Sequence, residues 1–197
     1  MVYGVDTANN VTNIVNTLKN DGYSFVCSYY SLAANSKRTS AAELAAIGNA
    51  GLKRVVVYQN LHNECQKFSE ATAQKDGSDA ISQAKAYRQP SGSAIYFAVD
   101  YDAPASHIDG DIKSHFQKLK SMMSLAGYTL GVYGSSLTCK KLKEAGIVNY
   151  TWLSMSPGHG FGTTWSGWNI HQTGEIIISG IKFDKDEANS LTTMGAW

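Results

Sequence analysis

Short apolar runs and longer amphipathic stretches alternate over the first three quarters of the chain. The short apolar runs predict strands. The stretches between them are helix-like, and in several cases they end on glycine. Repeated strand–helix units predict parallel strands joined by crossover helices. The expected strands cover residues 2–6, 23–30, 53–59, 91–100 and 128–134, and the expected helices cover residues 10–22, 39–51, 77–90, 109–126 and 136–146.

The pattern changes after residue 146. Three further strand-like runs, at 149–155, 166–172 and 178–184, leave no room for helices between them, and only a short helix at 186–191 could follow. Five strand–helix units and three bare strands predict an α/β fold, a TIM-like (β/α)5(β)3 barrel of eight mostly parallel strands. Residues 1–197 are expected to form this single domain, and an open doubly wound sheet is the alternative.

Composition narrows the class of protein. Among 197 residues, 43% are hydrophobic and 17% are charged, which is ordinary for a globular domain. The net charge of +1 gives no electrostatic footprint for nucleic acid. No apolar run reaches the length of a membrane span, and the first residues lack the features of a secretory signal. The three cysteines match no zinc spacing and no full disulfide framework. Neither a metal nor a cofactor is expected.

Two aspartates stand one residue apart at the end of the fourth expected strand, in "YFAVDYDAP". Successive side chains of a strand alternate between its faces, so Asp100 and Asp102 share a face with small residues such as Ala98. A polar turn after the strand is the simplest interpretation, because Asp-Ala-Pro is favourable in turns. Paired carboxylates on one face also fit an acid–base site.

In a β/α barrel the active site lies at the carboxyl ends of the strands. Four aspartates are expected at that rim and form the predicted catalytic set: Asp6, Asp100, Asp102 and Asp184. Aromatic and amide side chains at the same strand ends would bind a polar substrate. They are Tyr30, Tyr58, Gln59, Tyr133, Trp152, His171 and Gln172.

Clustered carboxyl groups flanked by aromatic rings are typical of sites that cleave glycosidic bonds. One carboxylic acid protonates the leaving oxygen, and a second carboxylate stabilises or captures the positive charge on the sugar. Repulsion between clustered carboxylates raises at least one pKa, which keeps an acid protonated near neutral pH. Glu64 is a further candidate acid. Aspartates together with His171 could instead ligate a metal in a hydrolase or deacetylase, although no histidine spacing supports this alternative.

An ordered set of segments carries a family resemblance over essentially the whole chain. The segments are "YGVDT", "TSAAELAAIGNAGLKRVVVYQ", "GSDAISQAKAYRQPSGSAIYFAVDYD", "AGYTLGVYGSS", "YTWLSM" and "WNIHQTGEIIISGIKFDKDEAN". The chain resembles the lysozymes of glycoside hydrolase family 25 and, more closely, the glycoside-hydrolase-like group catalogued as domain of unknown function 1906. The resemblance implies a barrel with five helices and three late bare strands, and cleavage between N-acetylmuramic acid and N-acetylglucosamine in bacterial cell wall. It also implies that Asp102, at the position of Glu in the family's Asp-x-Glu motif, is the general acid.

The expected function is therefore that of a peptidoglycan hydrolase, a bacteriolytic, antimicrobial muramidase whose partner is the glycan strand. Asp is one methylene shorter than Glu, so a weak or inactive carbohydrate-binding barrel is the alternative. Without a secretory signal, the protein is expected to be made in the cytoplasm. It would reach the periplasmic or extracellular cell wall by lysis or an injection-type secretion system. An immunity or delivery partner is left open.

Overall fold

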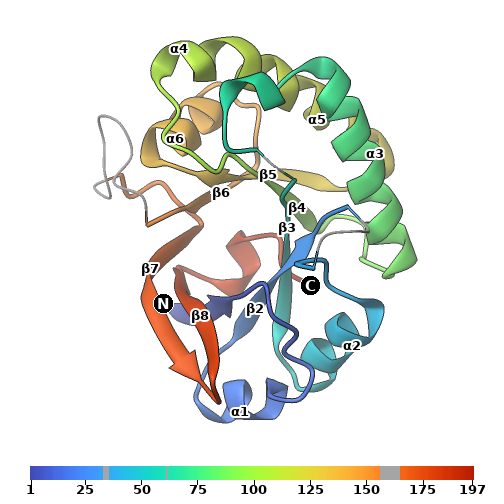
Figure 1. The fold of residues 1–197 in the computed structure, drawn as a ribbon, viewed down its shortest axis with the longest axis vertical. Helices are drawn as coiled ribbons and strands as arrows, with labels where there is room; N and C mark the ends of the chain where they lie inside the picture. The colour runs from blue at the N-terminus through green and yellow to red at the C-terminus, as the bar shows by residue number, and fades with distance from the viewer. Residues whose placement is uncertain (33–35, 61, 156–164) are drawn as a thin grey trace.

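The computed structural model describes residues 1–32, 36–60, 62–155 and 165–197. Eight strands close into a barrel in which each strand neighbours the next along the chain and β8 returns to β1 (Figure 1). The predicted closed barrel is confirmed, and the open doubly wound sheet is excluded. The strands are β1 (Val2–Asp6), β2 (Phe25–Tyr30), β3 (Lys53–Tyr58), β4 (Ala94–Ala98), β5 (Thr129–Gly134), β6 (Tyr150–Leu153), β7 (Ile170–Ile178) and β8 (Ile181–Ala188).

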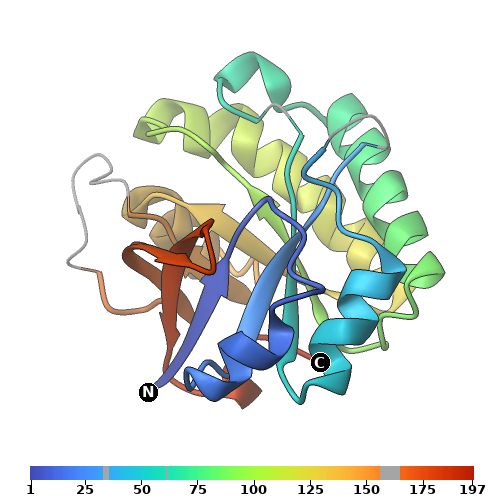
Figure 2. The same ribbon diagram turned by 60° about the horizontal axis from the view of Figure 1, so that its bottom comes forward.

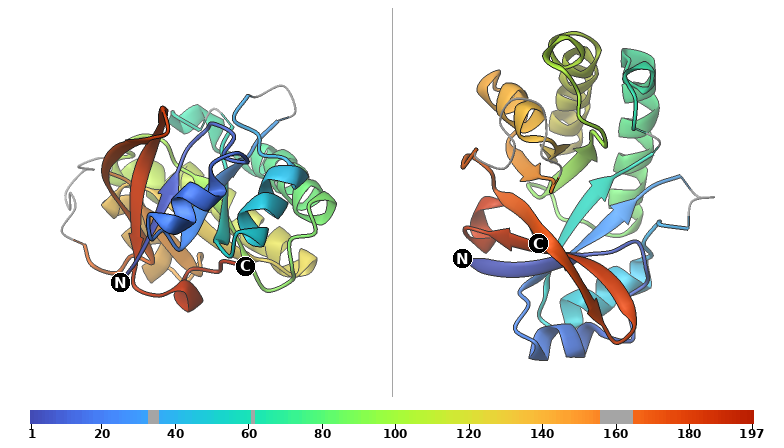
Figure 3. Two further views of the ribbon diagram at one scale, coloured as in Figure 1. Left: turned by 90° about the horizontal axis from the view of Figure 1, so that it is seen from below. Right: turned by 60° about the vertical axis from the view of Figure 1, so that its left-hand side comes forward.

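Helices follow the first five strands, as the sequence pattern predicts. They are α1 (Val15–Asn20), α2 (Ala41–Asn49), α3 (Glu70–Ala86), α4 (Ala105–His107), α5 (Lys113–Ala126) and α6 (Ser136–Glu144), with short helical turns at η1 (Cys65–Lys67), η2 (Ile108–Ile112) and η3 (Leu191–Thr193). No helix occurs among the described residues between β6 and β8. Figure 3 shows β7 and β8 as a long hairpin along one side of the barrel.

The barrel is mostly parallel, as predicted, and β8 is the strand that is not. β1 to β7 pair in parallel, whereas β8 runs antiparallel to both β7 and β1. A two-residue turn at Ser179 and Gly180, both with positive φ, joins β7 directly to β8. A turn this short can connect only antiparallel strands. The eighth strand is therefore present but spans residues 181–188 instead of 178–184, and the expected helix at 186–191 is wrong because residues 186–188 continue that strand.

α3 begins seven residues before the expected start. Ser69 caps the helix by accepting a hydrogen bond from the Thr72 backbone N–H, and the Thr72 hydroxyl accepts one from the Ser69 N–H. This reciprocal pairing satisfies two of the donors left open at a helix start. Gly77, which resembles a helix boundary in the sequence, lies inside α3. A Cβ there would come within 2.7 Å of the Met122 Cε on α5, so the glycine allows close packing of the two helices.

Side chains separate into two apolar layers. The barrel interior holds a cluster that includes Phe25, Tyr96 and Trp152, and a larger cluster lies between the strands and the helices. Gly131 makes room inside the barrel, since a Cβ on it would come within 2.5 Å of the Tyr96 ring. The end of the chain covers the amino-terminal end of the barrel, where the Met194 carbonyl accepts a hydrogen bond from the Tyr96 hydroxyl at 2.9 Å.

Both termini therefore lie at one end of the barrel, and the strand ends that build the site lie at the other. Figure 2 shows β1 rising from the amino terminus toward the rim opposite the two termini. Among the described residues, no helix combines the length and the apolar character needed to cross a membrane.

Candidate active site at the carboxyl rim of the barrel

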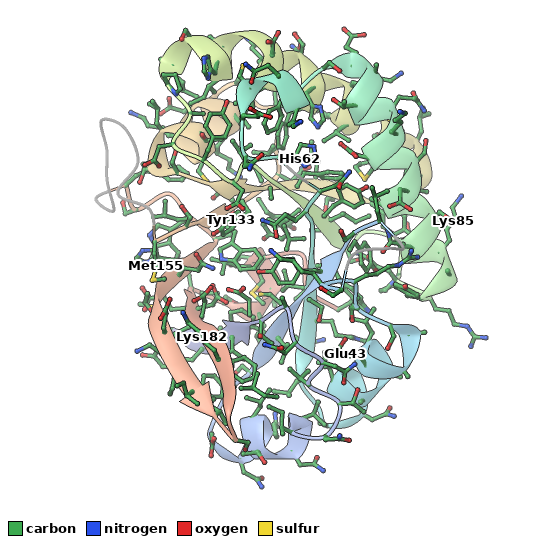
Figure 4. The ribbon with its side chains drawn as sticks, in the orientation of Figure 1. Glu43, His62, Lys85, Tyr133, Met155 and Lys182 are labelled. Carbon is green, nitrogen blue, oxygen red and sulfur yellow. The ribbon has the colours of Figure 1, made fainter. Side chains whose placement is uncertain are left out.

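Two cavities meet at the carboxyl rim, with volumes of about 330 Å³ and about 190 Å³. They share four lining residues, so they form one depression, here named the rim cavity. The shared residues are Asp100, Tyr133, Gln172 and Asp184. Figure 4 labels Tyr133 and Met155, both of which line the larger part. The rim is the end of the barrel at which the sequence analysis expects the site.

Asp6, the last residue of β1, is buried at the base of this site and is 1% exposed. Its Oδ1 accepts a hydrogen bond from the Tyr29 hydroxyl at 2.7 Å, and its Oδ2 accepts one from Gln172 Nε2 at 2.8 Å. The Gln172 Oε1 in turn accepts one from the Tyr133 hydroxyl at 3.0 Å. This chain of hydrogen bonds holds two cavity-lining side chains, Tyr133 and Gln172, in fixed orientations.

Asp186 forms a buried carboxyl pair with Asp6. The register of β1 and β8 places Gly4 opposite Asp186 and Asp6 opposite Asp184, so Asp186 lies one step deeper in the barrel. Burial raises the pKa of Asp6 to about 6, against hydrogen bonds from Tyr29 and Gln172 that lower it. Burial and the negative charge of Asp6 raise the pKa of Asp186 well above its ordinary value. A protonated Asp186 can donate to the Asp6 carboxylate. The Trp152 Nε1–H donates to the Oδ1 of Asp186 at 2.9 Å.

Asp184 lies on the wall of the rim cavity and is partly buried. Glu175 faces it across the β7–β8 pair and also lines the cavity. Burial and the charge of Glu175 raise the pKa of Asp184, and the Lys182 ammonium opposes this shift. Lys182 is itself paired with Glu175 at 2.8 Å. Asp184 is thus the carboxyl group of the cavity wall whose protonated form is stabilised.

Asp100 lies two residues beyond the end of β4 and lines both parts of the rim cavity. Its Oδ2 accepts a hydrogen bond from Gln59 Nε2 at 2.6 Å. The Gln59 Oε1 accepts one from Lys37 Nζ at 3.0 Å. The backbone N–H of Asp100 donates to the His62 carbonyl at 2.8 Å. Side-chain and backbone contacts together hold this carboxylate toward the cavity.

Asp102 is half-buried and lies outside the set of side chains that line the rim cavity. The strand geometry ends at Ala98, so the alternation that would place Asp102 beside Asp100 does not extend to it. Glu64 is exposed and pairs with Lys67 at 3.2 Å. The catalytic role of Asp102 stays a prediction from the sequence.

The predicted binding residues divide into two groups. Gln59, Tyr133, Trp152 and Gln172 line the rim cavity. The other three lie elsewhere: Tyr30 is buried and donates to Gln89, Tyr58 is buried and donates to Asp79, and His171 pairs with Glu187 at 3.3 Å. On β2, the side chain that faces the site is that of Tyr29 and not that of Tyr30.

Two acidic residues of the site are missing from the sequence prediction. Asp186 shares a face with Asp184 through the same one-residue spacing that singles out Asp100 and Asp102, but the expected strand stopped at 184. Glu175 reaches the cavity because a bulge between Gln172 and Gly174 inserts one extra residue into β7. The bulge lets side chains three positions apart face the same cavity, and the sequence alone carries no clear signal of it.

The family of the chain follows from its similarity to known proteins. Residues 16–185 match the family described as Rv2525c-like, glycoside hydrolase-like domain. The chain belongs to this family. It is also 35% identical to the protein YbfG of Bacillus subtilis over 170 residues, which cover 78% of this chain and 23% of YbfG. With the protein FadG of the same organism it shares 27% identity over 89% of this chain and 33% of FadG. The chain thus spans about a quarter to a third of these curated relatives.

Solved structures share the fold of this Rv2525c-like domain. The Tat-secreted protein Rv2525c of Mycobacterium tuberculosis, solved with L-tartrate, superposes with a TM-score of 0.83 at 16% identity, over 100% of this chain and 98% of that one. The muramidase of Trichobolus zukalii superposes with a TM-score of 0.62 at 14% identity, over 98% of this chain and 96% of that one. The autolysin LytC of Streptococcus pneumoniae, solved with a synthetic peptidoglycan ligand, superposes with a TM-score of 0.66 at 17% identity. The match covers 94% of this chain and 46% of that one. The glycoside-hydrolase-like fold implied by the sequence resemblance is therefore confirmed.

Proposed function

We propose that this Rv2525c-like domain hydrolyses a glycosidic bond of bacterial peptidoglycan, between N-acetylmuramic acid and N-acetylglucosamine, as a muramidase does. One observation carries the proposal: Asp100 and Asp184 line the same cavity from β4 and β8, which lie across the barrel from each other. Two carboxyl groups on opposite walls can flank a bound sugar. The shared fold with a muramidase, and with an autolysin that binds a peptidoglycan ligand, supports this glycan as the substrate.

Asp184, which lines the cavity, is favoured as the general acid over Asp102, which does not. Burial and the Glu175 charge raise the Asp184 pKa, so the proton needed by the leaving oxygen is retained to higher pH. The acid gives this proton to the glycosidic oxygen as the bond to the anomeric carbon breaks. The resulting carboxylate then accepts a proton from the water that completes hydrolysis. Activity should accordingly fall as the pH rises through the raised Asp184 pKa.

Asp100 is proposed as the carboxylate that assists attack on the anomeric carbon. A 2-acetamido sugar can attack its own anomeric carbon through the acetamido oxygen, an exception to the two-carboxylate schemes. A carboxylate then accepts a hydrogen bond from the acetamido N–H and balances the positive charge on that group. The 2.6 Å hydrogen bond from Gln59 holds Asp100 in place for this role. Such a reaction retains the anomeric configuration, which proton NMR of the released sugar can test.

The test measures new reducing ends and identifies products by mass spectrometry after the chain is incubated with purified peptidoglycan. Asp184→Asn and Asp100→Asn should each lower the rate about 10²–10⁴-fold, the range typical of general acid–base groups. Asp109→Asn is the matched control, because it removes an exposed carboxylate whose partner is Lys141. An Asp102→Asn variant that is inactive beside a fully active Asp184→Asn would assign the acid to Asp102, as the family resemblance implies.

The second candidate function is carbohydrate binding without turnover. It is favoured by Asp102, which is shorter than the Glu of the related motif and lies outside the lining of the rim cavity. A chain that sediments with insoluble peptidoglycan and releases no reducing ends would establish this function. It would refute the hydrolase proposal.

A further inference from the structure

Three buried side chains outside the rim cavity form a cluster of metal-ligand type. His62 follows β3, Asp76 lies on α3 and His115 lies on α5, and they are 3%, 5% and 1% exposed. Each offers one donor atom, and these three atoms lie within 4.8 Å of one another. We propose that this cluster binds a divalent transition-metal ion, with Zn²⁺ the best match to its two imidazoles and one carboxylate.

The chemistry of the donors fits one ion. Each zinc–ligand bond is about 2 Å long, so donors on a single ion lie about 3–4 Å apart. The His62 Nε2 and Asp76 Oδ2 atoms are already 2.9 Å apart. Bringing all three donors to one ion therefore requires only a small closing movement of side chains that come from separate elements.

The orientation of His115 is set from outside the cluster. Its Nδ1 lies 3.0 Å from the Ser69 carbonyl oxygen, which can only accept, so Nδ1 carries the proton. Nε2 is then the nitrogen with a free lone pair. A ligating histidine typically donates its other ring N–H to a backbone carbonyl in this manner, which fixes the tautomer.

His62 requires one change on binding. Without metal, its Nδ1 accepts a hydrogen bond from the Asn60 N–H at 3.4 Å, and its Nε2 can donate to Asp76. Metal binding through Nε2 moves the proton to Nδ1 and breaks the long contact with Asn60. The loop that holds Asn60 must therefore adjust when the ion enters.

A separate cavity of about 490 Å³ reaches this cluster and is lined by His62, Asp76 and Thr72. It gives an ion a route into the site and leaves room for water or an exogenous ligand at the remaining coordination position. Lys67 and Lys75 also line the cavity, which favours an anion as that exogenous ligand. Three protein donors with an open position are typical of reactive zinc sites, in contrast to closed structural ones. Among the described residues, none lines both this cavity and the rim cavity.

The cluster is also connected to the rim cavity through the backbone. The carbonyl of His62 accepts the hydrogen bond from the Asp100 N–H at 2.8 Å. An ion that fixes His62 between α3 and α5 therefore also fixes the peptide group that positions Asp100. Metal binding itself does not depend on the proposed glycoside hydrolysis.

Isothermal titration of the chelator-treated whole chain with ZnCl₂ tests the proposal, with MgCl₂ as the control for a hard cation. One zinc per chain with a dissociation constant in the micromolar range or below is expected, and no binding of magnesium. Asp76→Asn and His115→Gln, close in shape to the native residues, should each weaken zinc binding at least 100-fold. His171→Gln is the matched control, since it removes a histidine that pairs with a carboxylate, Glu187, outside this cluster.

Cobalt supplies a readout that does not depend on folding of the variants. Co²⁺ bound by two imidazoles and a carboxylate gives visible d–d absorption, which zinc should displace at one equivalent. A wild-type chain that binds no zinc, or that shows no cobalt absorption, overturns the proposal. Zinc binding that survives in folded Asp76→Asn and His115→Gln overturns it equally, because the ion would then lie elsewhere.

Discussion

The buried Asp6 carboxyl makes a quantitative prediction about stability against pH. Its pKa is raised from 3.8 to about 6, chiefly by burial. Between these two pH values the folded protein binds more protons than the unfolded chain, so the free energy of unfolding falls as pH rises. The stability present below pH 3.8 is lost as pH passes through about 6. A difference of about 2 units at 1.36 kcal/mol each gives a loss of roughly 3 kcal/mol.

Asp6→Asn removes this loss because an amide does not ionise. Urea unfolding of both proteins at pH 4, 5, 6 and 7 should show the stability of the variant relative to wild type rising by roughly 2 kcal/mol across the range, because part of the change already lies below pH 4. The offset at any single pH also reflects the changed hydrogen bond with Gln172, so the trend with pH is the quantity to compare. Burial keeps the pKa of Asp186 raised in the variant, but loss of the Asp6 charge lowers it. The trend with pH therefore reports on the buried carboxyl pair as a unit.

A second substitution tests the cause of the shift. Tyr29→Phe removes a hydrogen bond that stabilises the ionised form of Asp6, so the Asp6 pKa should rise further. The loss of stability should then move to higher pH, opposite to the effect of Asp6→Asn. Unfolding free energies that run parallel for wild type and Asp6→Asn from pH 4 to pH 7 would refute the reasoning.

Three further substitutions probe packing and hydrogen bonding. Gly131→Ala should lower the free energy of unfolding by about 1–3 kcal/mol in urea titrations, because the new Cβ would overlap the buried Tyr96 ring. Ser69→Ala should lower it by about 1 kcal/mol through loss of the α3 cap, and an unchanged urea midpoint would contradict that role. Trp152→Phe removes the indole N–H bonded to Asp186, so carboxyl NMR titration should show a still higher Asp186 pKa.

Local pattern was sufficient to predict the class of fold. Five short apolar runs, each followed by a helix-like stretch, predict parallel pairing, because a crossover helix returns the chain to the same end of the sheet. That topology brings the carboxyl ends of the strands to one rim, so the sequence alone predicts that Asp6, Asp100 and Asp184 lie near one another. The same reasoning placed Tyr133, Trp152 and Gln172 at the carboxyl rim, and all three line the rim cavity.

Tertiary structure decided the features that depend on strand ends and on pairing between distant segments. β4 ends at Ala98, so Asp102 leaves the alternation that the sequence pattern extended to it. The two-residue turn reverses β8 and extends it to Ala188, which places Asp186 beneath the rim, and the bulge in β7 turns Glu175 toward the cavity. The His62, Asp76 and His115 cluster joins a loop and two helices, and no spacing along the chain reports it. Periodicity records which face a residue takes within one element, but which elements meet depends on packing across the whole barrel.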